Sequence, residues 1–313
     1  MLHFANIRNK PEKILSLTSL TEKEFDYLFI AFEEVWSYQM QYFNFDGSKR
    51  QRTYREKSNA ILKLVEDKLF FILYYLKNNP LQEALAENFG MTQPQANVCI
   101  HYYKNLLHKT LSKLSCLAER EVSHLKSKLS NDEDLEFYCD GTERAIPRST
   151  DWETQKENYS GKKHCHSKKN NVITNNKCEI LYLSNTYEGS VHDKKITDEE
   201  KIALADKSKL FVDTGFQGIE VDGDSQIMIA TKKPRKKELS EEKKNLNTLL
   251  SRIRVRVEHA IGGVKRLRIV KDKVRTRKDN FRDMLMEMAC GLHNFRLKFR
   301  PWKYPKSEKI LQT

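Results

Sequence analysis

Three acidic residues of this chain stand in sequence contexts that suit phosphate chemistry. Asp140 and Asp213 each follow a short apolar run directly and precede a turn, in FYCDGTE and LFVDTGF. Glu258 is the single acid in RVRVEHAIGGVKR, a segment that otherwise carries cations. Carboxylates are ligands that Mg²⁺ prefers, so three of them brought together could hold metal ions. The simpler interpretations are that each Asp is a turn residue and that Glu258 is a salt-bridge partner.

Helical spacing places Glu258 beside two of these cations. At 100° per residue, Arg254, Glu258 and Lys265 fall within about 40° of one another, next to an apolar stripe. Glu258 is therefore expected at the edge of the buried face, where it can point toward the strand ends. The alternative is an exposed ion pair with Arg254, which would contribute only about 0.3–0.5 kcal/mol. Gly262 and Gly263 cost about 1 kcal/mol each in a helix and indicate a close backbone approach, as to a nucleic-acid strand.

The elements that would position these acids begin near residue 135. The pattern predicts a strand at 135–139, two strands in 159–193, a helix at about 194–206, a strand at 209–212, a strand in SQIMIAT and a helix at about 241–268. This order indicates an α/β fold with a mixed sheet. Asp140 and Asp213 would lie at the carboxyl edge of that sheet, where α/β proteins keep their sites.

The first part of the chain reads as helical. Thr21 and Glu24 have the spacing of a capping box at the start of one helix, and a second apolar helix spans about 60–77. The segment NPLQEALAENFGMTQPQANVCIHYYKNLL then has the helix, short glycine-containing turn and helix of a helix-turn-helix. The polar residues expected on its second helix are Gln93, Gln95, Asn97, His101 and Lys104. An ordinary helical hairpin is an equally good interpretation of the pattern alone.

Composition favours a polyanionic partner. The 313 residues carry a formal net charge of +13, and basic runs include KKPRKK and KRLRIVKDKVRTRK. The six cysteines form no C-x-x-C pair, which indicates a reduced, intracellular protein. The chain does not start like a signal peptide, and its most apolar run, KLFFILYYLK, is too short to span a bilayer, so no membrane partner is expected.

Changes in composition and hydrophobic pattern along the chain predict four parts. These are a helical domain at 1–115 with the helix-turn-helix at about 80–110, a linker at 116–134, a catalytic domain at 135–300 and a basic tail at 301–313.

In this order, YCDGTE, FVDTGFQG and RVRVEHAIGGVKR resemble the three catalytic blocks of DDE-superfamily transposases. The resemblance is closest to bacterial insertion-sequence transposases related to Harbinger-type elements, and it covers residues 135–300, with 20–115 similar in layout. It implies a ribonuclease-H-like α/β catalytic domain, a mixed sheet flanked by helices, preceded by an all-α helix-turn-helix domain.

The resemblance also assigns roles to residues. It implies that Asp140, Asp213 and Glu258 are the catalytic triad and bind two Mg²⁺ or Mn²⁺ ions. Arg254 and Lys265 match cations that related transposases place at fixed offsets from the Glu, whereas Ser251 stands where they have Tyr. GSVHD resembles a further element of this branch and adds His192 and Asp193 as second-tier candidates. The alternative for Asp193 is a helix cap.

The implied function is that of a DNA transposase, an endonuclease and strand transferase at the ends of a mobile element. Its expected partners are double-stranded DNA of the element ends and the target, with a homodimer assembled on that DNA. The expected location is the cytoplasm, on the nucleoid, or the nucleus in a eukaryotic host. The candidate DNA contacts are Arg254, Lys265, Arg266, Lys232, Lys233, Arg235, Gln93, Gln95 and Asn97. The alternative functions are those of a catalytically inactive, transposase-derived DNA-binding protein and of a ribonuclease-H-like nuclease without strand joining.

Overall fold

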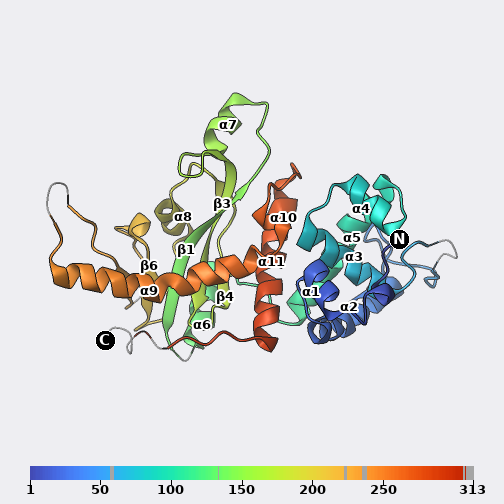
Figure 1. Cartoon of the computed structure of the whole chain (residues 1–313), viewed down its shortest axis with the longest axis horizontal. Coiled ribbons are helices and arrows are strands. Elements are labelled where there is room, and N and C mark those ends of the chain that lie inside the picture. Colours follow the sequence, from blue (N-terminus) through green and yellow to red (C-terminus); the bar gives the residue numbers. More distant parts are fainter. Residues whose placement is uncertain (57–59, 133, 222–223, 235–237, 306, 308–313) are drawn as a thin grey trace. The chain divides into compact units, whose positions relative to one another are not determined.

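The computed structural model describes residues 1–56, 60–132, 134–221, 224–234, 238–305 and 307. Contacts divide the chain into two compact units, which are described separately (Figure 1). The helical unit comprises Met1–Leu117 and Arg266–Asp272. The sheet unit comprises Ala118–Lys265 and Lys273–Thr313. No helix within the described ranges is both long and apolar enough to cross a membrane.

The helical unit packs its helices around aromatic side chains. Its elements are η1 (Phe4–Asn6), α1 (Pro11–Thr18), α2 (Glu22–Tyr42), α3 (Val65–Asn78), α4 (Gln82–Phe89), α5 (Gln93–Lys113) and α10 (Arg268–Lys271). The capping box that the sequence predicts is present, because Glu24 N–H donates to Thr21 Oγ1 and Thr21 N–H donates to Glu24 Oε2. Phe71 and Phe89 are fully buried, and their ring centroids lie 5.0 Å apart.

Helices α4 and α5 form the predicted helix-turn-helix. Gly90 ends α4 in the left-handed conformation, with φ +65°, which a glycine adopts without strain. Thr92 caps α5, and its N–H donates to Gln95 Oε1 over 2.9 Å. Leu85, Ile100 and Leu106 are buried, so the apolar faces of the two helices contribute to the core of the unit.

One segment of the helical unit comes from far along the chain. Arg266–Asp272 belongs to this unit and not to a continuous domain at 135–300, and α10 packs against α3. Leu267, Ile269 and Val270 are at most 3% exposed. Lys77 Nζ also donates to the carbonyl oxygen of Arg266 over 3.1 Å. The long helix predicted to reach residue 268 therefore ends at Val264, and the chain then enters the helical unit.

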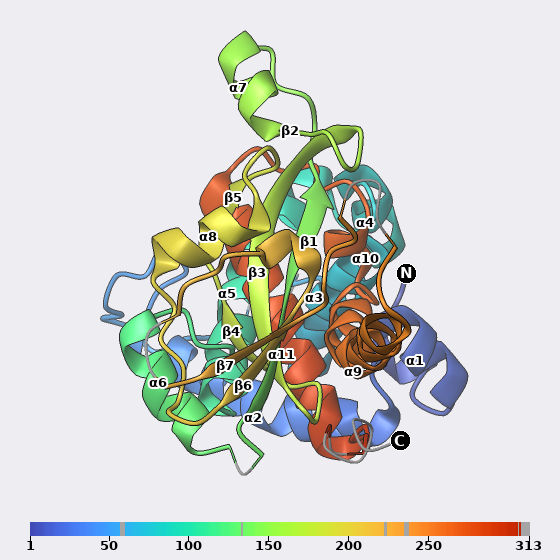
Figure 2. The ribbon, with the colours of Figure 1, turned by 90° about the vertical axis from the view of Figure 1, so that its left-hand side faces the viewer.

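The sheet unit is built on a mixed sheet (Figure 2). Its elements are α6 (Val122–Ser130), β1 (Glu136–Ala145), α7 (Trp152–Asn158), β2 (Tyr159–Ser160), β3 (Cys165–Asn175), β4 (Ile180–Leu183), β5 (Tyr187–Glu188), α8 (Asp193–Glu200), β6 (Lys209–Val212), η2 (Thr214–Phe216), β7 (Gln226–Ile229), α9 (Glu241–Val264) and α11 (Asp279–Phe299). The strand order is β2-β3-β1-β6-β7, with β4 and β5 also paired to β3. Strands β1, β6 and β7 run parallel, and β3 is antiparallel to β1. This is the predicted α/β class.

Helices cover the sheet on both faces. Phe137 and Cys139 of β1 pack in one cluster with Leu125 and Leu129 of α6. Tyr138, which points the other way, lies under Arg256 of α9, whose Cζ is 5.1 Å from the ring centroid. Since α6 contributes to this core, the segment 116–134 differs from the linker that the sequence suggested.

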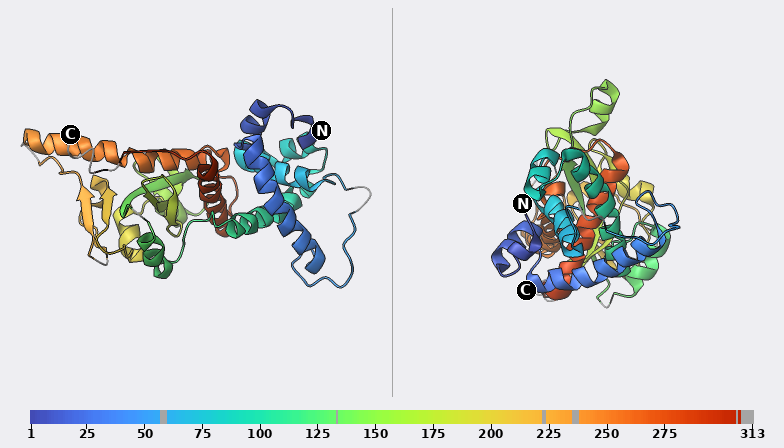
Figure 3. Two further views of the ribbon diagram at one scale, coloured as in Figure 1. Left: turned by 90° about the horizontal axis from the view of Figure 1, so that it is seen from below. Right: turned by 90° about the vertical axis from the view of Figure 1, so that its right-hand side faces the viewer.

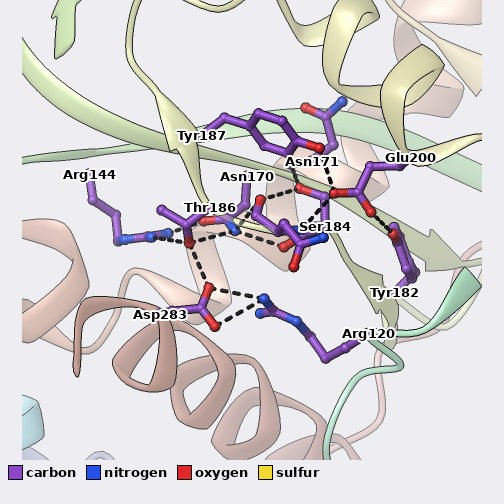
Figure 4. Close-up of polar contacts among 11 residues, drawn as sticks. Arg120, Arg144, Asn170, Asn171, Tyr182, Ser184, Thr186, Tyr187, Glu200 and Asp283 are labelled. Atoms are coloured by element: carbon purple, nitrogen blue, oxygen red, sulfur yellow. Dashed lines mark hydrogen bonds and ion pairs between the residues drawn. The ribbon is translucent and has the colours of Figure 1, made fainter. Parts of the chain in front are cut away.

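A polar network fixes the far end of β1 (Figure 4). Arg144 is 1% exposed, and its guanidinium donates to Asn170 of β3 and to Thr186 Oγ1. Thr186 in turn donates to Asp283 Oδ1 of α11 over 2.6 Å, and Arg120 Nη2 donates to both oxygens of Asp283 at 3.0 Å. Because buried polar groups that lose a partner are costly, this network holds β1, β3 and α11 in one arrangement.

Candidate active site

Asp140 lies inside β1 rather than after its end. The strand continues to Ala145, because β3 pairs with it from Phe137, opposite Asn175, to Ala145, opposite Ser167. The sequence predicted a strand of only 135–139, since the residues that follow are polar. Asp140 is thus held by ladder pairing on a central strand and not by a turn.

Asp213 lies beside Asp140 across the parallel pair of β1 and β6. The register places Tyr138 next to Phe211, so Asp140 and Asp213, two residues further on, project to the same side. Strand β6 occupies the predicted range 209–212, and Asp213 then caps η2 by accepting from Gly215 N–H. The two carboxylates are therefore neighbours at one place on the sheet.

Arg254 of α9 faces both carboxylates. Its Nη2 lies 3.9 Å from Asp140 Oδ2 and 4.0 Å from Asp213 Oδ2, which is too long for hydrogen bonds but close enough for charge attraction. The side chain is 14% exposed. Burial raises the pKa of Asp140 to about 6, although Arg254 and the Gly141 N–H act in the opposite direction. One guanidinium therefore does not fully offset the cost of burying this carboxylate.

Glu258 lies on α9 one helical turn beyond Arg254 and is exposed. No ion pair joins it to Arg254, whose guanidinium is directed to the aspartates instead. Across the described residues, no three His, Cys, Asp or Glu side chains are close enough together to hold a metal ion. The structure thus brings Asp140 and Asp213 together and leaves Glu258 apart from them.

The two glycines of α9 differ in their surroundings. A Cβ on Gly263 would lie 2.4 Å from His293 Nδ1 of α11, so the close approach that the sequence indicated is to a helix and not to a nucleic-acid strand. A Cβ on Gly262 would meet nothing within 4 Å. Lys265, three residues beyond Gly262, is half-buried, and burial together with the nearby Lys163 lowers its pKa.

Asp193 packs against β1 next to Asp140. A Cβ on Gly141 would lie 2.6 Å from Asp193 Oδ1, so only glycine fits beside this carboxylate. Lys169 Nζ lies 3.2 Å from Asp193 Oδ1 and 3.6 Å from Glu143 Oε1. The N-cap of α8 is His192, whose side chain makes no cap bond, so Asp193 is not the helix cap. Sequence reasoning missed Lys169 and Glu143, because their pairing depends on the register of β1 and β3.

The candidate base-contacting residues of α5 are held within the helical unit. Gln93 Nε2 and Asn97 Nδ2 both donate to Gln82 Oε1, and Gln95 accepts from the Thr92 N–H. Lys104 was expected on the exposed face of α5, but it is only 7% exposed because it lies on the face that packs into the helical unit.

The basic residues expected to contact DNA differ in exposure and in ion pairing. Lys232 is exposed, and Lys233 pairs with Glu238. Arg266 is exposed and lies in the helical unit. Arg235 lies outside the described residues.

Comparison with known proteins places these features in one family. Residues 139–294 match the family described as DDE superfamily endonuclease, and residues 62–113 match the helix-turn-helix of DDE superfamily endonuclease. A probable transposase for insertion sequence element IS702 from Microchaete diplosiphon is 23% identical over 289 residues, which cover 92% of this chain and 99% of that protein. No solved structure gives a significant match. Because both matched families are parts of one kind of protein and occur here in sequence, the chain belongs to the DDE superfamily of transposase endonucleases.

Proposed function

We propose that this protein cleaves DNA at the ends of a mobile element and joins the cut strands to a target, with Asp140, Asp213 and Glu258 as metal ligands. The observation that carries the proposal is that Asp140 of β1 and Asp213, directly after the parallel strand β6, both face Arg254. Two like charges in a partly buried place favour a positively charged ligand, because one guanidinium at about 4 Å offsets only part of the cost of burying Asp140.

The residues present fit a divalent cation. Asp140 and Asp213 offer hard oxygen ligands, and burial raises the pKa of Asp140, so a cation bound beside this carboxylate would offset the cost of burying it. Bound Mg²⁺ or Mn²⁺, two ions in this proposal, would stabilise charge on the attacking and leaving oxygens of the phosphodiester. Glu258 is the proposed third ligand, because it lies only one turn from Arg254 on the helix that faces both aspartates.

The cations of α9 have a separate task. Arg254 already neutralises part of the aspartates' charge and keeps both carboxylates on one side of the sheet. Lys265 is half-buried, and Asp140 and Glu143 are among the charges that act on it, which places it near β1. We assign both residues to the DNA phosphates at the cleavage site, where they would orient the scissile strand.

The helix-turn-helix is the proposed reader of the element ends. Its α5 carries Gln93, Gln95 and Asn97, whose amides can bond base edges, and Val98, which is 63% exposed. An exposed valine among amides suits contact with a thymine methyl group. Assembly as a homodimer on DNA, and location on the nucleoid, belong to the same proposal.

The test uses Asp140→Asn and Asp213→Asn in the full chain, with Asp206→Asn as the matched control. Asp206 is a 64% exposed acid of the same unit, paired with Lys126. The first two variants are expected to lose about 10³-fold or more of DNA cleavage and to bind fewer Mn²⁺ ions, with unchanged affinity for DNA. The control is expected to match the wild type. Normal cleavage by Asp213→Asn would remove the assignment.

Joined products distinguish a transposase from a simple nuclease. With element-end DNA, a supercoiled target and Mg²⁺ or Mn²⁺, the wild type is expected to give joined strands, and Ca²⁺ is expected to bind but support the reaction poorly. Cleavage without any joined product would instead identify a nuclease of the same fold.

A further inference from the structure

A pocket of about 190 Å³ lies in the sheet unit beyond the end of β1. Its wall is formed by Ile146 and the loop after it, by α7, by the first part of β3 and by residues 277–282 at the start of α11. The connection that carries α7 stands out from the sheet in Figures 1 and 2 and in the right-hand view of Figure 3. The pocket is separate from the aspartates, because six residues of extended strand between Asp140 and Ile146 span roughly 20 Å.

The lining of this pocket is strongly basic. Four cations line it, Arg148, Lys168, Arg277 and Arg282, against the single carboxylate of Asp279. Lys168 and Arg282 are only 8% and 7% exposed, so these two cations are part of the buried wall of the pocket and do not lie at its exposed edge. Buried cations favour an anionic ligand because water screens them poorly.

Several of these donors are available to a ligand. Two of the four cations are already paired: Arg282 Nη1 donates to Asp279 Oδ1 over 3.0 Å, and Lys168 Nζ donates to Glu188 Oε1 over 3.1 Å. Arg148 uses only its Nε, which donates to Gln155 over 2.7 Å. Arg277 is exposed and makes no hydrogen bond or ion pair with the described residues. Two guanidinium groups therefore still have free N–H donors at the mouth.

The lining also supplies small hydroxyl donors, and an exposed aromatic residue, Trp152, lies between two of the lining residues, Thr150 and Thr154, in the sequence. Ser149, Thr150 and Thr154 belong to the wall. Trp152, the first residue of α7, is 68% exposed, and its indole stacks on no ring of the described chain. Guanidinium forks with hydroxyls suit the oxygens of a phosphate, and an exposed indole suits a nucleobase.

We propose that this pocket binds a backbone phosphate of the DNA substrate and that Trp152 stacks on an unpaired base next to that phosphate. The inference rests on the proposed function, which supplies DNA as the ligand. The roughly 20 Å separation from Asp140 corresponds to about six base pairs of duplex, so the contact lies on the flank of the cut and not at the scissile phosphate. Arg148 and Arg277 hold the phosphate at the mouth, and the paired Lys168 and Arg282 form the wall behind them.

The test measures DNA binding by the full chain in EDTA, so that cleavage plays no part. The variants are Arg148→Gln, Arg277→Gln, their combination and Trp152→Ala. Lys156→Gln is the control, because Lys156 is an exposed cation of α7 that does not line the pocket. The probes are a blunt duplex of random sequence and the same duplex with a single-stranded extension.

Each Arg→Gln change is expected to lower the slope of log Kd against log salt by about one, and the double variant by about two. Trp152→Ala is expected to weaken binding of the extended probe roughly 10-fold and leave the blunt duplex unaffected. Lys156→Gln is expected to keep the wild-type slope. An unchanged slope in the double variant, with a wild-type melting temperature, would overturn the pocket assignment. Changed slopes in a protein that shows no metal-dependent cleavage would leave this site standing and remove only the proposed transposase activity.

Discussion

The helical unit and the sheet unit hold their candidate functional side chains in opposite ways. In the helix-turn-helix, Gln93 and Asn97 donate to Gln82, and Gln95 accepts from a backbone N–H. In the sheet unit, Asp140 and Asp213 share one guanidinium at about 4 Å, and burial raises the pKa of Asp140 to about 6. The amides of the first surface already have partners within the chain, whereas Asp140 of the second is buried at a cost that Arg254 does not fully offset.

This difference has a physical consequence for each surface. Amides that already have partners are ordered before DNA arrives, so little side-chain entropy remains to be lost on binding. The buried, ionised carboxylate of Asp140 destabilises the folded protein, so a cation that bound to it would stabilise the folded state. Substitutions at the two surfaces should therefore change stability in opposite directions.

The largest expected effect on stability comes from Asp140→Asn. The folded pKa of about 6 lies above the ordinary 3.8, so at pH 8 the ionised carboxylate destabilises the folded protein. The asparagine variant is expected to be more stable without metal by about 1–3 kcal/mol at pH 8. That gain shrinks as the pH falls through 6, because the wild type then takes up its proton. Urea unfolding at pH 8 and pH 5 measures it; a less stable variant at pH 8 would contradict the comparison.

An effect of similar size on the unfolding free energy concerns the packing of α9 against α11 within the sheet unit. Gly263→Ala is expected to cost about 1–3 kcal/mol, because the added Cβ would meet the ring of His293. Gly262→Ala, one residue away, is the matched control and should be neutral or stabilising by up to about 1 kcal/mol, since nothing lies within 4 Å. Thermal unfolding of both variants decides it, and equal effects would mean that α11 does not fix α9 here.

The smallest effect belongs to the helix-turn-helix. Gln95→Ala removes the side chain that accepts from Thr92 N–H, so we expect a loss of about 0.5–1 kcal/mol in unfolding free energy. The same variant should discriminate less between element-end and random DNA. Fluorescence anisotropy with both DNAs tests this, with the exposed Lys109→Gln of the same helix as the control. Undiminished discrimination would show that Gln95 serves only as a cap.

Local patterns predicted the parts of the fold that local interactions determine. The capping box of Thr21 and Glu24, the turn at Gly90 and the strand 209–212 all follow from side chains close in sequence. The α/β class followed from the order of such elements. Asp140 and Asp213 became candidates because an acid directly after a short apolar run is a local signal as well.

Long-range packing decided what the sequence could not predict. Strand β1 extends through its polar residues to Ala145 because β3 pairs with them, and no alternation in the sequence marks this. Gly263 is required by His293, which lies on a different helix. Arg266–Asp272 joins the helical unit although about 150 residues separate it from that unit in sequence. The segment is short and has as many basic as apolar residues, three of each, so its sequence gave little indication of burial.

The most direct test of the central claim is the number of Mn²⁺ ions bound by Glu258→Gln, measured with full-length protein and element-end DNA beside the wild type. Glutamine keeps the shape of the side chain and removes the charge that a divalent cation needs. If Glu258 completes the site formed by Asp140 and Asp213, the wild type binds about two ions, as in two-metal enzymes, and the variant binds fewer. The variant also loses cleavage and melts no lower than the wild type without metal. Wild-type Mn²⁺ binding by an active Glu258→Gln variant would contradict the account.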